Sequence, residues 1–203
     1  MNKKILFNYD QLIIPDPLSA DWKLKIVGEH NRENAAFAVA ALHVLGLSEE
    51  EIRSGIESFE PVEGRLQFVR EVNGTKIYND NNATTPEATV AALEALGKNI
   101  TLIVGGSEKD LALETLVSII KQNVSHVILF THEKYKGSTR LAALLKEEEV
   151  PFEEVHSLES GLEAALSHTE KGVILFSPAF ASFGMFKNEY DRNDQFLRLV
   201  RAL

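Results

Sequence analysis

The chain has 203 residues, which is enough for one domain or for one domain and a fragment of another. Its hydrophobic content of 44% is ordinary for a globular protein, while its formal net charge of -9 disfavours nucleic acid and anionic membrane surfaces as partners. It contains no cysteine, which excludes a disulfide framework, a thiolate metal site and a cysteine nucleophile, and which fits a cytoplasmic location.

The amino terminus does not resemble a targeting or membrane segment. Its short apolar runs are interrupted by Asn8, Tyr9 and Asp10, which is too early for a signal peptide. No stretch approaches the roughly 20 apolar residues that a membrane span needs. We therefore expect a cytoplasmic protein that binds neither nucleic acid nor a membrane.

The first third of the chain predicts short strands followed by two helices. Residues 4–27 contain three strand-like pieces, ILF, QLII and KLKIV, separated by turn residues. A helix is expected to open near Asn31, where small and apolar residues recur at helical spacing, and to end at Gly46. The sequence SEEE from Ser48 is typical of a capping box and predicts the start of a second helix.

From Arg65 onward the pattern changes. LQFVREV and TKIYND flank Asn73-Gly74, the strongest short signal for a β-hairpin. Short apolar strands and amphipathic helices then alternate, which predicts an α/β fold with a mostly parallel sheet covered by helices on both faces. The predicted strands are NITLIVGG, HVILF, PFEEV and GVILFS, and the predicted helices span residues 85–97, 110–122, 137–148 and 157–169, with a last helix ending at Leu203. A domain boundary is expected near residues 60–64, between domains 1–60 and 61–203.

Three polar loops follow strands of this predicted sheet. They span residues 79–85, 105–110 and 177–187. Because ligands in such sheets bind outside the carboxyl ends of the strands, we expect these loops to converge on one site.

Two features of the middle loop have both a structural and a functional interpretation. Gly105-Gly106 would let the backbone approach a ligand, but the pair lacks the GxGxxG spacing of a dinucleotide site, and an ordinary turn is the commoner explanation. Lys109 could bind a carboxylate or phosphate, or it could be a solvated lysine at a helix start.

The third loop, SPAFASFGMFKN, combines hydroxyl and aromatic residues. Hydroxyls of Ser177 and Ser182, with free backbone N–H groups at a helix start, could bind a carboxylate. Neither serine lies in a GxSxG elbow and neither has an evident His or Asp partner, so serine-hydrolase chemistry is disfavoured. Phe180, Phe183 and Phe186 recur every three residues, which usually indicates packing.

The remaining polar candidates carry weaker signals. The six histidines form no HExxH or other close ligand pair, so no metal site built by the protein is predicted. In GEHNRENA, helix capping explains only one of Asn31 and Asn34. Arg65, close to the domain boundary, is either an ordinary surface residue or a phosphate-binding arginine, because a planar guanidinium suits spread phosphoryl charge.

Five motifs in order, GEHNRENAAFAVAA, EGR, YNDNNATTPEAT, VGGSEK and SPAFASFGMFKN, resemble the Mur ligase superfamily. The pattern is most similar to the branch that adds D-glutamate to UDP-N-acetylmuramoyl-L-alanine in peptidoglycan biosynthesis. The resemblance implies that residues 1–60 are the tail of the central ATPase domain and that residues 61–203 are the complete, Rossmann-like C-terminal domain that binds the amino acid.

The resemblance also implies an acyl-phosphate mechanism, in which ATP with Mg²⁺ activates a carboxylate that the amine of D-glutamate then attacks. The sequence contains no GxxxxGK[ST] phosphate loop, no recognisable UDP-binding domain and no counterpart of the family's magnesium ligands. We therefore expect that this chain alone is inactive, binds no cofactor tightly and carries no metal or catalytic residue of its own.

The matching positions are assigned by this resemblance to two groups. Asn82 stands where the family usually has a lysine. The loss of that positive charge should weaken a contact with the nucleotide or with a carboxylate. The nucleotide-binding group is Asn31, Asn34, Arg65, Asp80 and Asn82, and the D-glutamate-binding group is Thr84, Lys109, Ser182 and Phe183.

Two alternatives remain. The chain could be a free-standing binding module, derived from a Mur ligase and without catalysis, or it could belong to a related amide ligase such as a folylpolyglutamate synthase. The loop of residues 79–84 disfavours the synthase. The surface of the helix at residues 31–46 distinguishes the other two, because a ligase fragment should expose apolar area there and an adapted module should not.

Overall fold

The computed structural model describes residues 15–203, so the predicted strand-like pieces ILF and QLII lie outside the described residues. Contacts divide the chain into two compact units, Met1–Glu60 and Pro61–Leu203. No helix within residues 15–203 is long and apolar enough to cross a membrane.

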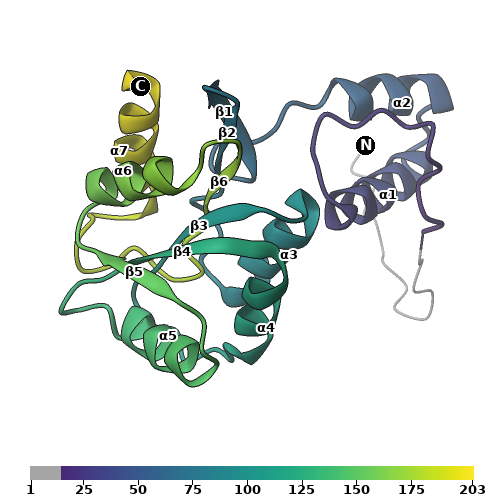
Figure 1. The fold of residues 1–203 in the computed structure, drawn as a ribbon. Coiled ribbons are helices and arrows are strands. Elements are labelled where there is room, and N and C mark those ends of the chain that lie inside the picture. Colours follow the sequence, from purple (N-terminus) through teal and green to yellow (C-terminus); the bar gives the residue numbers. More distant parts are fainter. Residues whose placement is uncertain (1–14) are drawn as a thin grey trace. The chain divides into compact units, whose positions relative to one another are not determined.

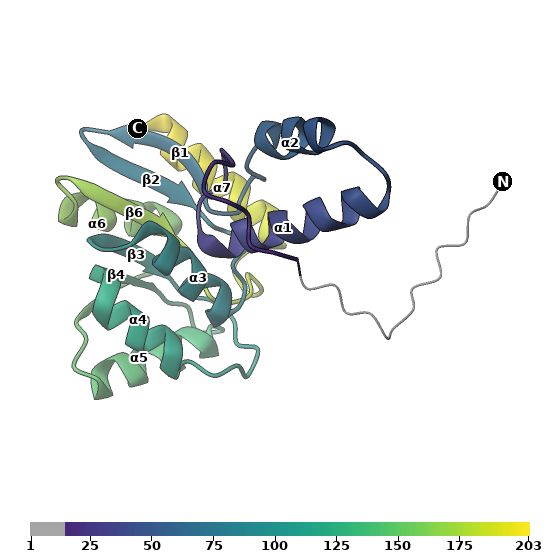
Figure 2. The same ribbon diagram turned by 90° about the vertical axis from the view of Figure 1, so that its right-hand side faces the viewer.

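The described part of the first unit contains two helices, α1 (Glu29–Val44) and α2 (Glu49–Ser58), joined by a short loop (Figure 2). The predicted capping box is confirmed, because the Ser48 side chain accepts from the Glu51 amide and the Glu51 carboxylate accepts from the Ser48 amide at 2.9 Å. The guanidinium of Arg53 lies 4.5 Å from the centroid of the Trp22 ring, which is buried.

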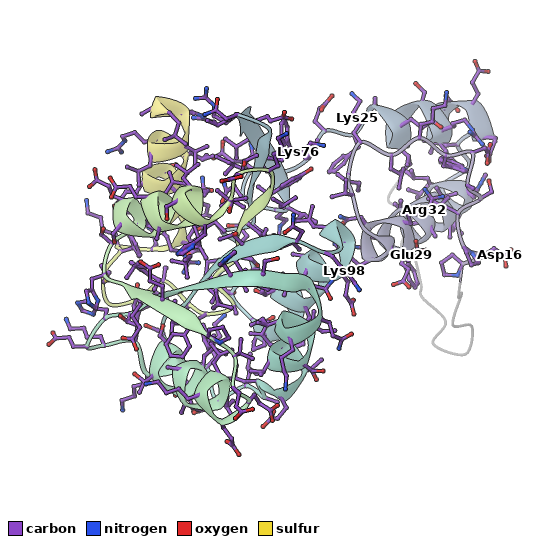
Figure 3. The ribbon with its side chains drawn as sticks, viewed as in Figure 1. Asp16, Lys25, Glu29, Arg32, Lys76 and Lys98 are labelled. Atoms are coloured by element: carbon purple, nitrogen blue, oxygen red, sulfur yellow. The ribbon has the colours of Figure 1, made fainter. Side chains whose placement is uncertain are left out.

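The segment before α1 differs from its prediction. Lys23–Val27, the predicted strand KLKIV, forms no strand. A strand needs a neighbouring strand to pair its backbone groups, and the described part of this unit contains none. Side chains hold the segment instead, because the Lys23 amide donates to the Glu57 carboxylate at 3.1 Å and Asn31 of α1 donates to the Val27 carbonyl at 2.7 Å. Arg32 of α1, labelled in Figure 3, likewise holds the residues before the segment by donating to the carbonyl oxygens of Leu18 and Ser19 at 3.1 and 2.6 Å.

The second unit is built on a six-stranded sheet in the order β1-β2-β6-β3-β4-β5 (Figure 1). β1 is antiparallel to β2, and all other neighbours are parallel, which confirms a mostly parallel α/β sheet. The predicted hairpin is confirmed, with both turn residues Asn73 and Gly74 at positive φ. The strands are β1 (Gln67–Val72), β2 (Thr75–Asn79), β3 (Ile100–Val104), β4 (Val124–Phe130), β5 (Phe152–Val155) and β6 (Gly172–Phe176).

Helices cover both faces of this sheet (Figure 1). One face carries α3 (Pro86–Leu96), α4 (Glu114–Asn123) and α5 (Lys136–Glu147), and the other carries α6 (Leu158–His168) and α7 (Glu189–Ala202). In β3, Leu102 and Val104 join the first core while Ile103 joins the second, as the two-residue period of a strand requires. Each such fully buried side chain stabilises the fold by roughly 1.5–3 kcal/mol.

One helix begins later than predicted. The helix expected from residue 110 begins at Glu114, so Lys109 lies within a loop and not at a helix start. Asp110 has a φ of 53°, which is left-handed and incompatible with continuing a helix. The carbonyl of Leu111 accepts a hydrogen bond from the Arg140 guanidinium of α5 at 2.5 Å, which further fixes this segment outside the helix.

Candidate functional site

The three polar loops meet at the carboxyl edge of β2, β6 and β3. β2 and β3 lead into helices on one face of the sheet, whereas β6, which lies between them, leads into α7 on the other face. The chain therefore diverges on both sides of β6, which is the topological switch point where open α/β sheets bind ligands. Hydrogen bonds join all three loops across this point.

Asp80 anchors the first loop to the end of β6 and to the start of β1. Its backbone N–H donates to the Phe176 carbonyl at 2.8 Å. One carboxylate oxygen accepts from the Leu66 amide at 2.9 Å, and the other accepts from the Ser177 hydroxyl at 2.8 Å. With 7% of its surface exposed, the carboxyl group mainly orders the loop.

Burial raises the pKa of Asp80 to about 6, because removing a carboxylate from water disfavours its charged form. The hydrogen bonds from Ser177 and from the Leu66 amide, and the positive charge of Arg65, act in the opposite direction and are outweighed. The Asp80 carboxyl group therefore titrates near pH 6.

Asn81 joins the first loop to α7. It is fully buried, and its side-chain amide donates to the Glu189 carbonyl at 2.9 Å. Both its side-chain oxygen and its backbone carbonyl accept hydrogen bonds from the Arg192 guanidinium at 2.8 Å. Arg192 also donates to the Phe180 carbonyl of the third loop at 3.3 Å. Burial lowers the pKa of Arg192 to about 10, so the group stays charged at neutral pH.

Asn82 holds the segment that precedes Arg65. Its backbone N–H donates to the Gly64 carbonyl at 2.8 Å, and its side-chain amide donates to the Glu63 carbonyl at 3.2 Å. Gly64 has a φ of 75°, and a Cβ atom there would lie 3.1 Å from the Asn82 amide, so the two residues pack closely. Asn82 is therefore engaged with the backbone of residues 63 and 64.

Lys109 and Thr84 connect the second loop to the first. The Lys109 ammonium donates to the Thr84 hydroxyl at 2.9 Å, although the two residues are 25 positions apart in the sequence. Lys109 is exposed and Thr84 is half-buried, so both groups remain within reach of a ligand. An ammonium group paired only with a neutral hydroxyl is well suited to accept a carboxylate as a stronger partner.

The second and third loops pair through backbone hydrogen bonds. Ser107 N–H donates to the Ala181 carbonyl at 2.9 Å, and the reverse bond is 3.1 Å long. Ser182 is buried beside this pair, and its carbonyl accepts from the Tyr135 hydroxyl at 3.3 Å. Phe183 is 62% exposed, so the packing interpretation of the three phenylalanines is wrong for this one.

Gly105 is required by packing of the chain against itself. A Cβ atom at this position would lie 2.2 Å from the Phe130 carbonyl oxygen. Its N–H donates to the Pro178 carbonyl at 3.0 Å, and the N–H of Gly106 donates to the Ser138 hydroxyl at 2.8 Å. Both amides are used internally, which favours the structural interpretation of the glycine pair.

Asn31 and Asn34 belong to the first unit. Neither caps α1, whose N-cap is Gly28, so the capping explanation is wrong for both. The Asn31 side chain donates to the Val27 carbonyl at 2.7 Å, and Asn34 is exposed on the helix surface.

Four polar residues of the site were not predicted from the sequence. A sequence signal existed for Arg192, which shares the helix face of the apolar Phe196 and Val200 at spacings of four and eight. Ser177 has an Asp partner after all, Asp80, but this serine is buried. The missed residues are Asn79, Asn81, Arg192 and Asn193. Within residues 15–203, no group of three or more acidic or histidine side chains could hold a metal ion.

Residues 64–180 match the family model described as Mur ligase, glutamate ligase domain. This match covers more than half of the chain, and the α/β sheet agrees with it, so the chain belongs to the Mur ligase family.

The closely similar curated relatives are called UDP-N-acetylmuramoylalanine--D-glutamate ligase. The relative from Caldanaerobacter subterraneus is 38% identical over 181 residues, which cover 88% of this chain and 40% of that protein. The relative from Pseudomonas fluorescens is 37% identical over 186 residues, covering 89% and 40%. The chain therefore spans about 40% of the length of these relatives.

Solved structures with low sequence identity share the fold. A folylpolyglutamate synthase from Mycobacterium tuberculosis matches with a TM-score of 0.67 and 16% identity, covering 87% of this chain and 42% of the synthase. A UDP-N-acetylmuramoylalanyl-D-glutamyl-2,6-diaminopimelate--D-alanyl-D-alanyl ligase from Acinetobacter baumannii matches with a TM-score of 0.61 and 21% identity, covering 88% and 38%.

Proposed function

We propose that this chain is the C-terminal part of an ATP-dependent ligase that adds D-glutamate to UDP-N-acetylmuramoyl-L-alanine in peptidoglycan biosynthesis. The identity of 38% to a ligase with this substrate in its name supports the proposal. The observation that carries it is the pairing of Lys109 with Thr84 at 2.9 Å, because a basic group and a hydroxyl from separate loops form the core of a carboxylate site.

The proposed D-glutamate site consists of Thr84, Lys109, Ser182 and Phe183. Lys109 would exchange its neutral partner for a substrate carboxylate, with Thr84 donating to the same group. Ser182 lies in the adjoining loop and would anchor the second carboxylate, while the exposed Phe183 ring would cover the aliphatic part of the amino acid. A dicarboxylic amino acid has the charge and the two anionic ends that such a site needs.

The proposed nucleotide-binding residues are Arg65, Asp80 and Asn82 in the second unit and Asn31 and Asn34 in the first. Arg65 is exposed and is available to phosphate oxygens. Asp80 is 7% exposed, so it would act on the nucleotide mainly through the loop that its hydrogen bonds to Leu66 and Ser177 order. Asn82 would act through the turn of residues 63–64 that leads to Arg65.

In the proposed reaction ATP transfers its γ-phosphoryl group to the alanyl carboxylate of the UDP-linked substrate and leaves as ADP; Mg²⁺, when bound, would neutralise phosphate charge. The amine of D-glutamate then attacks the acyl phosphate and loses a proton, and the amide forms as inorganic phosphate leaves. This chain would hold the amino acid and align its amine with the acyl phosphate, which would contribute to catalysis through positioning. Residues outside this chain would supply the metal ligands and the phosphate loop, so we expect the chain alone to have no ligase activity.

The first unit is proposed to be the tail of the central ATPase domain. Phe37, Val44 and Leu45 are 57%, 71% and 63% exposed, so α1 and its C-terminal end present apolar side chains at the surface of this unit. This exposure favours a ligase fragment over a free-standing binding module. A fragment should self-associate at high concentration in analytical ultracentrifugation, whereas a concentration-independent monomer would favour the module.

The amino-acid site is tested by titrating D-glutamate and L-glutamate into the ¹⁵N-labelled chain and following the amide signals of the three loops by NMR. We expect saturable shifts of Thr84 and Lys109 with D-glutamate and weaker ones with L-glutamate. Lys109→Met, which keeps the apolar stem and removes the charge, should weaken binding about tenfold or more, since a charged hydrogen bond contributes roughly 1.5–3 kcal/mol.

Lys98→Met is the matched control, because Lys98 is an exposed lysine that follows α3 (Figure 3). It should bind D-glutamate as the unchanged chain does. Equal losses in the two variants would show that overall charge, and not a site at Lys109, governs binding. Equal affinity for the two enantiomers would contradict a D-glutamate site.

A further inference from the structure

Arg192 occupies an unusual position for a charged residue. It lies in the second turn of α7 and is 1% exposed. Among residues 15–203, its guanidinium donates only to neutral oxygens, namely the side-chain and backbone oxygens of Asn81 and the backbone oxygen of Phe180. Burying a charge without a bonded carboxylate is costly, so these neutral contacts must be geometrically good for the arrangement to persist.

The acceptors of Arg192 belong to two different loops. Asn81 lies between Asp80 and Thr84 in the first loop, whereas Phe180 lies two residues before Ser182 in the third. A planar guanidinium with donors in a fixed fork can bind both loops at once and fix the distance between them. A lysine ammonium is a single point charge and cannot reproduce this spacing.

We propose that Arg192 is a positioning residue that ties the first and third loops together, so that Thr84 and Ser182 are presented to the amino-acid substrate as one preformed site. The part of this proposal that concerns substrate binding rests on the proposed function. The part that concerns the link between the two loops does not, because it follows from contacts within this chain. Without Arg192, the two loops keep their backbone contacts and the hydrogen bond from the Ser177 hydroxyl to the Asp80 carboxylate, but they lose the link that joins Asn81 to Phe180.

The neighbouring contacts support this role. The side-chain amide of Asn81 also donates to the Glu189 carbonyl at 2.9 Å, so both Glu189 and Arg192 of α7 bind Asn81 in the first loop. The third loop is fixed to the second by the paired bonds of Ser107 and Ala181. The Arg192 side chain therefore links α7 directly to both loops, and its loss should make both loops less ordered.

The test is amide hydrogen exchange of the 203-residue chain, measured by NMR for the unchanged protein and for Arg192→Lys. The reporters are hydrogen-bonded amides of the two loops. In the first loop, the Asn82 amide donates to the Gly64 carbonyl and the Ala83 amide to the Asp80 carbonyl; in the third, the Ala181 amide donates to the Ser107 carbonyl. We expect exchange at these amides to accelerate at least about tenfold in Arg192→Lys, since hydrogen bonds to charged groups are among the strongest local contacts. Amides of the central strand β3 should change much less.

Val200→Ala is the matched control. Val200 is fully buried in the same helix and packs in the core, so its truncation destabilises the unit without touching the loops. If Arg192→Lys accelerates loop and sheet amides by the same factor, as Val200→Ala should, Arg192 only stabilises the fold and the proposal is overturned. Acceleration in one loop alone also overturns it.

D-glutamate titration of the same variants separates the two levels of the proposal. Arg192→Lys should weaken binding about tenfold, by analogy with the loss of one charged hydrogen bond, while Val200→Ala should bind normally where folded. Loosened loops with unchanged affinity would refute a role in the substrate site. If the unchanged chain does not bind D-glutamate at all, the proposed function fails, while the exchange experiment still decides whether Arg192 ties the loops.

Discussion

Asp80→Asn should make the second unit more stable at neutral pH and leave it unchanged in acid. The reason is the pKa of Asp80, which is about 6 in the folded chain against the ordinary value of 3.8 for an aspartate. Between these values the folded state keeps a proton that the unfolded state has lost, so stability falls as pH rises through this window. Above pH 6 the carboxyl group is charged in a buried position and destabilises the fold.

The magnitude follows from the size of the shift. A difference of about two pKa units corresponds to about 3 kcal/mol, at about 1.4 kcal/mol per unit. Asparagine can keep the local hydrogen bonds, because its oxygen can accept from Leu66 and its amide can donate to Ser177. The Ser177 hydroxyl would then turn to Thr89, whose hydroxyl oxygen lies 2.8 Å away.

The assay is urea unfolding of both proteins from pH 3.5 to pH 8, followed by far-UV circular dichroism. The stability difference between Asp80→Asn and the unchanged chain should rise by up to about 3 kcal/mol between pH 4 and pH 7. Asp191→Asn is the contrasting control, because hydrogen bonds from Lys187 and Gln195 hold the pKa of this carboxyl below its usual value, so its removal should destabilise at neutral pH. A pH-independent difference for Asp80→Asn would refute the reasoning.

Two further substitutions test the packing around the site and the first unit. Gly105→Ala should destabilise the second unit by roughly 3 kcal/mol or more in thermal unfolding, since its Cβ would lie 2.2 Å from the Phe130 oxygen. Gly97→Ala is the control: its Cβ meets no atom within 4 Å, so the same measurement should show a loss of only about 1–3 kcal/mol. Ser48→Ala removes the capping box of α2 and should destabilise the first unit by about 1 kcal/mol, measured by fluorescence of Trp22, the only tryptophan; an unchanged Trp22 transition would contradict the capping role.

The features that could be predicted from the sequence are those set by local patterns. The hairpin at Asn73-Gly74 requires two residues at positive φ, and these two residues adopt it readily. The capping box at Ser48 depends on a spacing of three residues, which is visible in the sequence. The helix α3 follows Thr85 and opens with Pro86, as the preference for proline in the first turn predicts.

The features that were missed depend on contacts between distant residues. Arg192 and Asn81 are 111 positions apart, and no local pattern connects an arginine in a helix to an asparagine in a loop. The late start of α4 likewise depends on a contact from Arg140 to the carbonyl of Leu111, 29 positions away. The sequence could place the three loops at one edge of the sheet but could not determine which of their side chains face inward.

The candidate site is held largely by the chain's own hydrogen bonds, and this bears on how a ligand would bind. Asp80, Asn81 and Arg192 are buried and satisfied, so they order the loops without being exposed to solvent. The Lys109–Thr84 contact, in contrast, is accessible and joins a charged donor to a neutral acceptor. A carboxylate could replace that contact without disturbing the buried network. Since the loops would then need little further ordering, most of the interaction energy would remain available for binding.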